Sequence, residues 1–350
     1  MTSADLPVAL VGYGLAGRYF HAPVLSAVDG LVLTTIVTAS PERAAAARHD
    51  FPEAQVVADW EQADRPGLVV LATPNRTHAS LALGAIAAGL PVVVDKPLAR
   101  DVPEGETIAQ AARTAGVPLT VFHNRRWDSD VRTAHKLLAE GALGRPHRLE
   151  TRFERWRPQP GTGWRESADY EEGGGLLLDL GSHQVDVAVH LLGPVTTVYA
   201  ELDQRRPGAR VEDDVMLALT HASGARSTHW LSATAAHRGP RLRLLGSQAA
   251  YVVEDLDGQE AALRAGARPA DGWGEVPESR WGVLTTGDTS VPVPSVPGDY
   301  RLFYAGVLEG LRGNGPLPVT AEEAVHVLAV LDAARVSARE RRLVDLPPPD

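Results

Sequence analysis

The first 120 residues alternate short apolar runs with alanine-rich stretches that carry the polar residues. Almost every position in the runs is hydrophobic, as in strands that are buried on both faces, whereas the stretches between them have the composition of helices. Strands that alternate with helices form a parallel sheet covered by helices on both sides. The pattern therefore predicts a doubly wound sheet, with strands within residues 7–14, 31–37, 55–57, 68–74, 91–97 and 118–123.

From His123 onward, apolar and polar positions alternate over short segments separated by Gly, Pro and Asp, as in strands with one face in water. Consecutive segments of this kind predict an open and mostly antiparallel sheet. A polar helix is expected over about Ser129 to Glu140, whereas Asp257 to Pro297 has the Gly, Pro and Trp content of long loops. The strands are expected within residues 148–156, 195–202, 213–222, 225–234, 240–246 and 249–255.

Two helices have clear end signals. Asp101 is a candidate N-cap for a helix that stops at Gly116, and Thr320 with Glu323 forms a capping box for a last helix that reaches about Arg339. A chain of 350 residues exceeds what one hydrophobic core usually holds. We therefore predict an α/β protein with a doubly wound domain over residues 1–122 and a second α/β domain over residues 123–350.

Composition and charge narrow the functional classes. The chain is 44% hydrophobic and 22% charged, which is typical of a soluble globular protein. Its net charge of −10 argues against nucleic acid or an anionic membrane as a partner. It has no cysteine, which excludes thiolate chemistry, and its twelve histidines form no H-x-x-x-H or H-E-x-x-H pair, so no metal site is predicted. No signal peptide is evident, and we expect a cytoplasmic protein.

A glycine motif closes the first predicted strand. Residues 12–17 fit G-x-G-x-x-G at a strand-to-helix turn, where glycines allow the backbone to approach a pyrophosphate and the helix N-terminus attracts it. The alternative is a purely structural turn. We predict a Rossmann dinucleotide-binding domain in which this loop binds the cofactor through Gly12, Tyr13, Gly14, Leu15, Ala16 and Gly17.

The end of the second strand bears on cofactor preference. NAD-specific proteins hold the ribose diol there with an acidic residue, but this chain has Thr-Ala-Ser-Pro over residues 38–41. Ser40 and Arg43 are therefore candidate ligands of a 2′-phosphate, although Arg43 can also be an ordinary solvated helix residue. We predict that NADP is preferred over NAD.

The ends of the fourth and fifth strands carry further polar residues. Ligands of doubly wound sheets bind at the carboxyl ends of the strands. Lys96 could donate to a substrate hydroxyl, or it could be a solvated loop lysine. The candidate cofactor-binding residues at these two strand ends are Thr73, Pro74, Asn75, His78, Asp95, Lys96 and Pro97.

Polar residues also gather after the sixth strand and further along the chain. Asn124 and Arg125 are candidate substrate ligands in the segment HNRRWD, where Arg–Asp pairing and Trp packing offer a structural explanation. Trp164 and Arg165 are candidates in a Gly- and Pro-rich loop, as a lid element or a loop anchor. The run GGGLLLDLGSHQVD places an aspartate and a histidine four residues apart on one helix face, and burying either group is costly unless it is paired.

Together these motifs resemble the Gfo/Idh/MocA family of nicotinamide-dependent sugar and polyol dehydrogenases. The likeness rests on GYGLAG, TPNRTH, DKP in place of the usual EKP, and GGGLLLDLGSHQVD, and it covers essentially the whole chain. The segments GYGLAGRYFHAPVL, HNRRWD, WRE and PVTAEEA resemble the NADP-linked scyllo-inositol dehydrogenase branch.

The resemblance implies a catalytic set of Lys96, Asp179 and His183 beside the nicotinamide. Histidine has a suitable pKa to accept the hydroxyl proton, and a lysine can stabilise developing alkoxide charge. The expected reaction is the reversible oxidation of a ring hydroxyl of a polyol or sugar. Asp95 and Ala39 depart from the family pattern, the latter where NADP-linked relatives often have arginine.

Two alternatives remain from the sequence. One is a non-catalytic NAD(P)-binding regulator, which should have lost the Lys/Asp/His set, and the other is a reductase of a different sugar or a dihydrodiol. A broad sheet with only one further long helix to cover it also predicts a homodimer or homotetramer.

Overall fold

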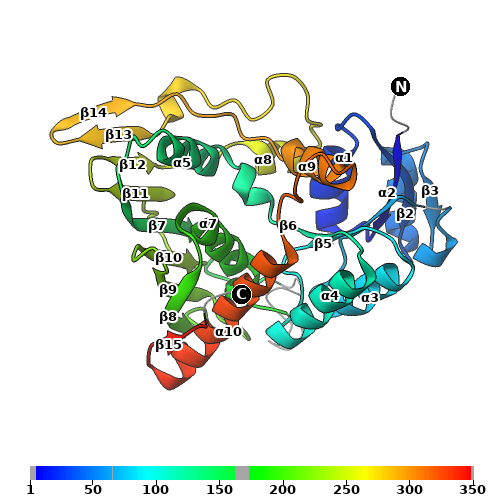
Figure 1. Cartoon of the computed structure of the whole chain (residues 1–350), viewed down its shortest axis with the longest axis horizontal. Helices are drawn as coiled ribbons and strands as arrows, with labels where there is room; N and C mark the ends of the chain where they lie inside the picture. The colour runs from blue at the N-terminus through cyan, green and yellow to red at the C-terminus, as the bar shows by residue number, and fades with distance from the viewer. Residues whose placement is uncertain (1–4, 65, 162–172, 348–350) are drawn as a thin grey trace.

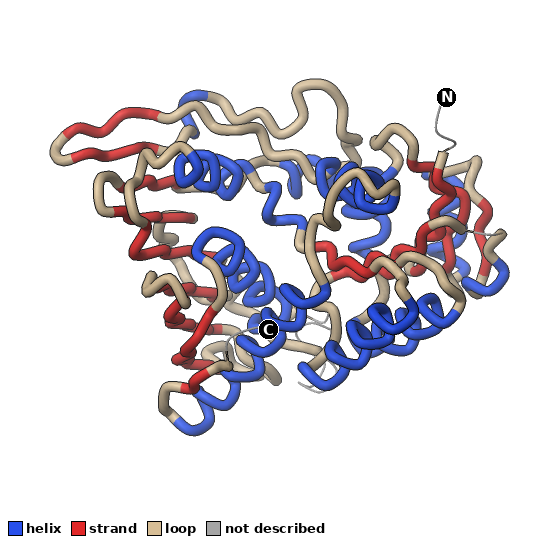
Figure 2. The backbone as a smooth tube through the Cα atoms, viewed as in Figure 1, coloured by secondary structure: helices blue, strands red, loops and turns tan. Residues whose placement is uncertain are grey.

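The computed structural model describes residues 5–64, 66–161 and 173–347. Figures 1 and 2 show a sheet at each end of the molecule, with helices α5 (Ser129–Ala139), α7 (Ser182–Leu192) and α10 (Ala321–Glu340) on the side of the second sheet that faces the first. The prediction of two sheets in sequence order is confirmed.

The first sheet is parallel throughout, with strand order β3-β2-β1-β4-β5-β6. The order reverses direction between β1 and β4, which is the point where doubly wound sheets bind ligands. The predicted doubly wound fold is confirmed. Its strands are β1 (Leu6–Val11), β2 (Leu31–Val37), β3 (Gln55–Val57), β4 (Leu68–Leu71), β5 (Val92–Asp95) and β6 (Leu119–Phe122). The helices are α1 (Ala22–Leu25), α2 (Pro41–Asp50), α3 (His78–Ala87) and α4 (Val102–Ala115), with short turns η1 (Gly17–His21), η2 (Trp60–Gln62) and η3 (Asn75–Thr77).

The predicted helix-end signals operate as expected. The Asp101 carboxylate accepts a hydrogen bond from the Glu104 N–H at 2.9 Å and caps α4, which ends at Gly116 in the left-handed conformation. Thr320 and Glu323 make both hydrogen bonds of a capping box at the start of α10. Each cap satisfies backbone N–H groups that have no partner inside the helix.

The second sheet has nine strands in the order β14-β13-β12-β11-β7-β10-β9-β8-β15. Every neighbouring pair is antiparallel except β7 and β10, which run parallel, so the predicted open and mostly antiparallel sheet is confirmed. The strands are β7 (Pro146–Glu154), β8 (Val195–Asp203), β9 (Asp214–His221), β10 (Arg226–Ser232), β11 (Leu242–Gly246), β12 (Ala250–Val253), β13 (Val283–Thr286), β14 (Thr289–Pro292) and β15 (Val344–Asp345).

The expectation of loops from Asp257 to Pro297 is wrong in part. The segment contains helix α8 (Gln259–Arg264), the turn η7 (Glu278–Arg280) and the hairpin of β13 and β14. All four residues of β14 are exposed, so its strand conformation comes from pairing with β13 at the edge of the sheet and leaves no alternation of apolar positions to detect.

From residue 301 onward the chain returns to the first sheet, which the sequence did not reveal. Helix α9 (Arg301–Leu311) places the Phe303 ring 4.9 Å from that of Phe122 on β6. Helix α10 then contributes Leu328 to the core of the first sheet and Leu331 to the core of the second. One continuous helix therefore belongs to both cores and fixes how the two sheets face each other.

Candidate active site

Two adjoining cavities lie at the carboxyl ends of the strands of the first sheet. The first, of about 460 Å³, runs along the glycine loop and the ends of β2, β4 and β5. The second, of about 320 Å³, lies between the two sheets. The residues that line both cavities are Leu15, Ala16, Asp95, Lys96 and Asp179. A cofactor in the first cavity and a substrate in the second would meet at these residues.

The glycine loop has a shape that only glycines allow at two positions. Gly12 has a φ of +100°, and a Cβ there would lie 2.4 Å from the Ala72 oxygen. A Cβ on Gly17 would lie 2.0 Å from the Gly12 oxygen. Gly14 faces the first cavity, where a Cβ would approach only the Arg43 guanidinium, at 3.8 Å. This open backbone suits a pyrophosphate at the start of a helix.

Tyr13, within this loop, is buried and does not line the first cavity. Its hydroxyl donates to the Asp50 carboxylate at 2.9 Å, which ties the loop to the end of α2. Burial and the neighbouring carboxylate raise the pKa of this phenol, so it remains a hydrogen-bond donor. Its side chain therefore supports the loop.

The end of β2 presents a cation to the first cavity. Arg43 lines this cavity together with Thr38 and Ala39, and its side chain is exposed. Within residues 5–64, 66–161 and 173–347, its guanidinium makes no side-chain hydrogen bond or ion pair. Ser40 caps α2 by accepting a hydrogen bond from the Arg43 N–H at 3.3 Å, so it fixes the turn from which Arg43 extends.

The ends of β4 and β5 are joined by a buried histidine. Thr73, Pro74 and Asn75 line the first cavity, as predicted for the strand end. His78 is fully buried, and its ring nitrogens lie 2.9 Å from the Thr73 oxygen and 2.9 Å from the Pro97 oxygen. It thus fastens the two loops to each other and does not itself line either cavity.

Asp95 holds the backbone that carries Lys96. Its Oδ1 accepts a hydrogen bond from the Lys96 N–H at 2.9 Å and lies 3.6 Å from Nε2 of the buried His21. Burial alone would raise the pKa of Asp95, but the contacts with His21, Lys96 and His78 lower it overall. The ionised Asp95 carboxylate therefore orients the loop, although the aspartate side chain is one methylene shorter than that of the usual glutamate.

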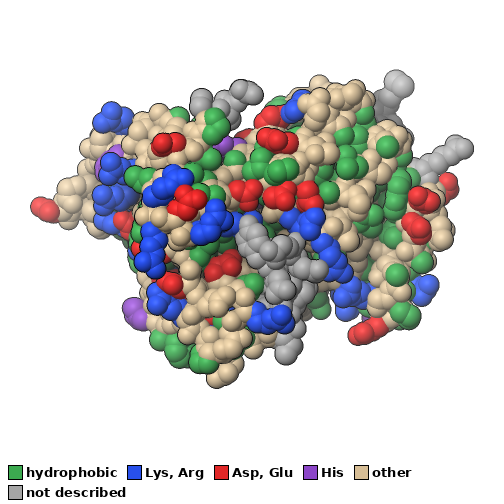
Figure 3. Space-filling view, turned by 90° about the horizontal axis from the view of Figure 1, so that it is seen from below, with side chains coloured by type: hydrophobic (Ala, Val, Ile, Leu, Met, Phe, Trp, Pro, Cys, Tyr) green, Lys and Arg blue, Asp and Glu red, His purple; other side chains and the backbone are tan. Residues whose placement is uncertain are grey.

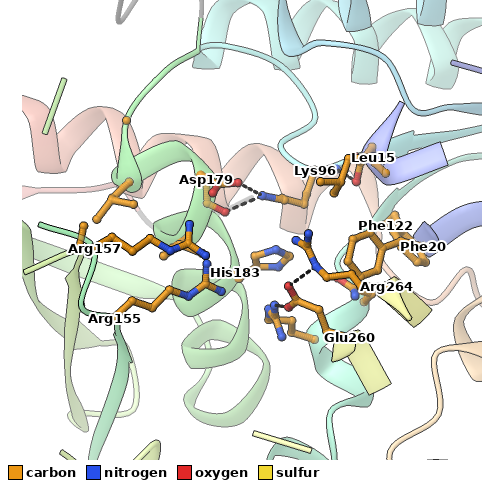
Figure 4. A pocket seen from close by; sticks show the side chains of 18 of the residues that line it. Leu15, Phe20, Lys96, Phe122, Arg155, Arg157, Asp179, His183, Glu260 and Arg264 are labelled. Atoms are coloured by element: carbon orange, nitrogen blue, oxygen red, sulfur yellow. Dashed lines mark hydrogen bonds and ion pairs between the residues drawn. The ribbon is translucent and has the colours of Figure 1, made fainter. Parts of the chain in front are cut away.

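The lysine and the aspartate from the two halves of the chain meet at the junction of the cavities. Lys96 Nζ lies 3.1 Å from Asp179 Oδ1 and 2.5 Å from the Asp179 carbonyl oxygen, and Figure 4 shows this contact. Asp179 is in the π-helical turn η6 (Leu177–Gly181), which leads directly into α7. Turns of this kind are frequent at functional sites.

His183 lies in the first turn of α7 and lines the second cavity. It is only 7% exposed, and its Nδ1 has no hydrogen-bond partner within the part of the chain that the structure describes. Burial lowers its pKa well below the ordinary value, and the charges of Lys96 and Arg125 lower it further. The lowered pKa favours the neutral imidazole, which is the form a proton acceptor needs.

The predicted substrate ligands have different outcomes. Asn124 and Arg125 line the second cavity, and Arg125 is also paired with Asp128 at 3.1 Å and with Glu260 at 2.6 Å. The ion pairs agree with the structural explanation of this segment, and substrate binding by Asn124 and Arg125 stays a prediction. Trp164 and Arg165 lie outside the described residues.

Several residues of the second cavity were not singled out from the sequence. Apolar and polar residues alternate at the end of β7, in RFERWRP, and this alternation was the signal that could have pointed to Arg155 and Arg157. Phe122 is the last residue of β6, and the others come from loops and helices brought in by tertiary packing. The additional lining residues include Phe20, Phe122, Arg155, Arg157, Arg206, Glu260 and Arg264.

Among the described residues, no three or more His, Asp or Glu side chains are grouped as metal ligands. None of the helices in the described ranges is long and apolar enough to cross a membrane.

Comparisons with known proteins agree with this geometry. Residues 6–123 match the oxidoreductase family with an NAD-binding Rossmann fold, and residues 131–252 match the GFO/IDH/MocA C-terminal domain. The chain is 37% identical to scyllo-inositol 2-dehydrogenase (NADP+) IolW of Bacillus subtilis, over 97% of this chain and 96% of the relative. It is 29% identical to D-apiose dehydrogenase of Paraburkholderia graminis, over 97% and 89% of the two chains. A solved structure of the oxidoreductase YvaA of Bacillus subtilis superposes with a TM-score of 0.92 at 35% identity, over 99% of this chain and all of the other.

Proposed function

Because this chain belongs to the GFO/IDH/MocA family of NAD-binding oxidoreductases, we propose that it interconverts a ring hydroxyl and a ketone of a cyclic polyol or sugar resembling scyllo-inositol. Residues 1–122 would hold the cofactor, and residues 123–350 would supply most of the substrate site. The observation that carries the proposal is the contact of Lys96 with Asp179, beside His183, where the two cavities meet.

The residues around this junction suit alcohol oxidation. The reaction removes a hydride from the ring carbon and a proton from its hydroxyl, and a bound nicotinamide is the group that accepts the hydride. His183 is buried and neutral, so it can take the proton. The Lys96 ammonium can stabilise the negative charge that develops on the substrate oxygen. Asp179 holds that ammonium in place and can accept a hydrogen bond from a neighbouring hydroxyl.

The first cavity supports NADP as the preferred cofactor. No carboxylate lies among residues 38–41, where one would hold the ribose diol of NAD. Arg43 lines the cavity at that strand end, and its guanidinium, which has no side-chain partner among the described residues, can meet a 2′-phosphate. The relative IolW, whose name includes NADP+, agrees with this preference.

A substrate screen tests the proposal. Inositols and aldoses are incubated with NADP or NAD, and formation of the reduced nicotinamide is followed by absorbance. We expect turnover of a cyclic polyol or sugar, with a higher kcat/KM for NADP than for NAD. Cofactor binding without turnover of any of these compounds would contradict the proposed function.

A further inference from the structure

Two arginines follow β7 on an extended segment at the edge of the second cavity. The backbone there is fixed by hydrogen bonds from the Arg155 N–H to the Ser232 oxygen at 2.8 Å and from the Arg157 N–H to the Ala233 oxygen at 2.7 Å. Side chains two residues apart in an extended strand lie on the same side. Trp156, between them, is 58% exposed and does not line the cavity, whereas both arginines do, Arg155 half-buried and Arg157 exposed. Figure 4 shows their guanidinium groups side by side, directed toward the space beside His183.

These two arginines differ from the other cations of the cavity in having no hydrogen-bond or ion-pair partner among the described residues. Lys96 is paired with Asp179, Arg125 and Arg264 with Glu260, and Arg206 with Asp213. Across the ranges that the structure describes, Arg155 and Arg157 make no side-chain hydrogen bond or ion pair. Arg155 lies with its guanidinium carbon 4.9 Å from the centre of the Phe153 ring, which leaves its N–H groups available.

The cavity as a whole is basic. Six of its lining residues are Lys or Arg, whereas three are Asp or Glu. The outer face in Figure 3 carries side chains of both signs close together, and the chain has a net charge of −10. The excess of positive charge is therefore a local property of this cavity. Two adjacent guanidinium groups repel each other, and a bound anion with several oxygen atoms would relieve that repulsion and accept hydrogen bonds from both.

We propose that Arg155 and Arg157 bind an oxyanion of the substrate, so that the preferred substrate is an acidic polyol or sugar that bears a carboxylate or phosphate group. This inference rests on the proposed function, because it assumes that the second cavity holds the reacting ring. The cofactor phosphates do not explain the pair, since the glycine loop and Arg43 line the first cavity and neither arginine does.

The positions of these residues also predict how the substrate is oriented in the second cavity. In Figure 4, Arg155 and Arg157 lie on one side of His183, and Leu15, Phe122 and Arg264 lie on the other. Leu15 lines both cavities, so the nicotinamide would enter from its side. The acidic group would therefore be held away from the reacting carbon, with the hydroxyl to be oxidised toward His183 and Lys96.

Matched compounds test the proposal. Glucose, glucuronate and glucose 6-phosphate, and in parallel myo-inositol and a myo-inositol monophosphate, are compared in wild type, Arg155→Gln and Arg157→Gln. Losing a charge-assisted hydrogen bond should lower kcat/KM for the acidic compound by roughly 10- to 100-fold, mainly through KM, with little change for the neutral one. Whichever acidic compound has the higher kcat/KM in wild type identifies the bound oxyanion as a carboxylate or a phosphate. Arg226→Gln is the control, because Arg226 is exposed at the opposite end of β10 and should leave all values unchanged.

Binding provides a readout that does not need turnover. Isothermal titration of the same compounds in the presence of NADPH, which cannot accept a hydride from the hydroxyl, should show binding of an acidic member that each arginine variant weakens. If that binding is seen without turnover, the proposed function fails but the anion site stands. A wild-type enzyme that binds and oxidises the neutral compounds as well as the acidic ones would overturn the inference. Equal losses for neutral and acidic compounds in both variants would overturn it as well.

Discussion

Lys96 and Asp179 are 83 residues apart in the sequence, yet the lysine Nζ lies 3.1 Å from the aspartate Oδ1 and 2.5 Å from the aspartate carbonyl oxygen. Their side chains are 12% and 27% exposed. One residue comes from the end of β5 in the first sheet, and the other from the turn that begins α7. The ion pair therefore lies where the first cavity meets the second. A change at either residue should affect both the proposed cofactor site and the proposed substrate site.

Replacing Lys96 with Met should lower kcat more than it raises KM. The substitution keeps a similar length but removes a charge whose effect is greatest when the substrate oxygen becomes negative in the transition state. Steady-state kinetics with the best substrate measures both parameters. Lys136→Met is the control, because Lys136 is 55% exposed on α5 and pairs only weakly with Glu140, at 3.9 Å. Unchanged kcat in Lys96→Met would exclude a role for the ammonium in the chemical step.

The pH dependence of oxidation should reflect the lowered pKa of His183. A general base acts in its deprotonated form, so the rate falls as pH drops through its pKa. Because burial and neighbouring cations lower this pKa, the fall should come at a pH below about 6.5, the ordinary value for histidine. The burial of His183 therefore moves the rise of activity with pH to a more acidic range than an exposed histidine would give. A fall in the oxidation rate that is centred above neutral pH would indicate that another residue is the base.

Cofactor preference should respond to changes at the end of β2. In Ser40→Asp, a carboxylate near the ribose would repel a 2′-phosphate and accept hydrogen bonds from the diol of NAD. The ratio of kcat/KM for NADP to that for NAD should therefore fall. Arg43→Ala should raise the KM for NADP by roughly 10-fold, the usual effect of losing one charge-assisted hydrogen bond. A wild-type enzyme with a higher kcat/KM for NAD would reverse the preference.

Much of the fold could be predicted because the signals are local. The continuous apolar strands, the glycines at 12, 14 and 17, and the caps at Asp101 and Thr320 each depend on neighbouring residues. The second cavity was less accessible to sequence reasoning. Glu260 reaches it from α8, a helix in a stretch expected to form loops, and pairs with Arg125 across 135 positions. Such pairs depend on tertiary packing, as does the structural role of His78 between two loops.

The second sheet leads us to expect a homo-oligomer. Buried positions of β9 alternate with half-exposed ones, and Met216 is paired with Trp230 of β10 on the half-exposed face. Large apolar side chains on such a face are often covered by a partner subunit. Light scattering at micromolar concentration should give a dimer or tetramer of the 37.3 kDa chain. Trp230→Glu should reduce the assembly, and a wild-type monomer mass would contradict this expectation.

The central claim is that His183 accepts the proton of the substrate hydroxyl, and the kcat of His183→Ala tests it most directly. The account predicts a loss of roughly 10²- to 10⁴-fold in kcat for oxidation. NADP affinity should be unchanged in a fluorescence titration, because the glycine loop and Arg43 line the other cavity. His147→Ala, at an exposed position at the start of β7, should match wild type in both measurements. A kcat of His183→Ala within a few-fold of wild type would contradict the account and make Lys96 the candidate base.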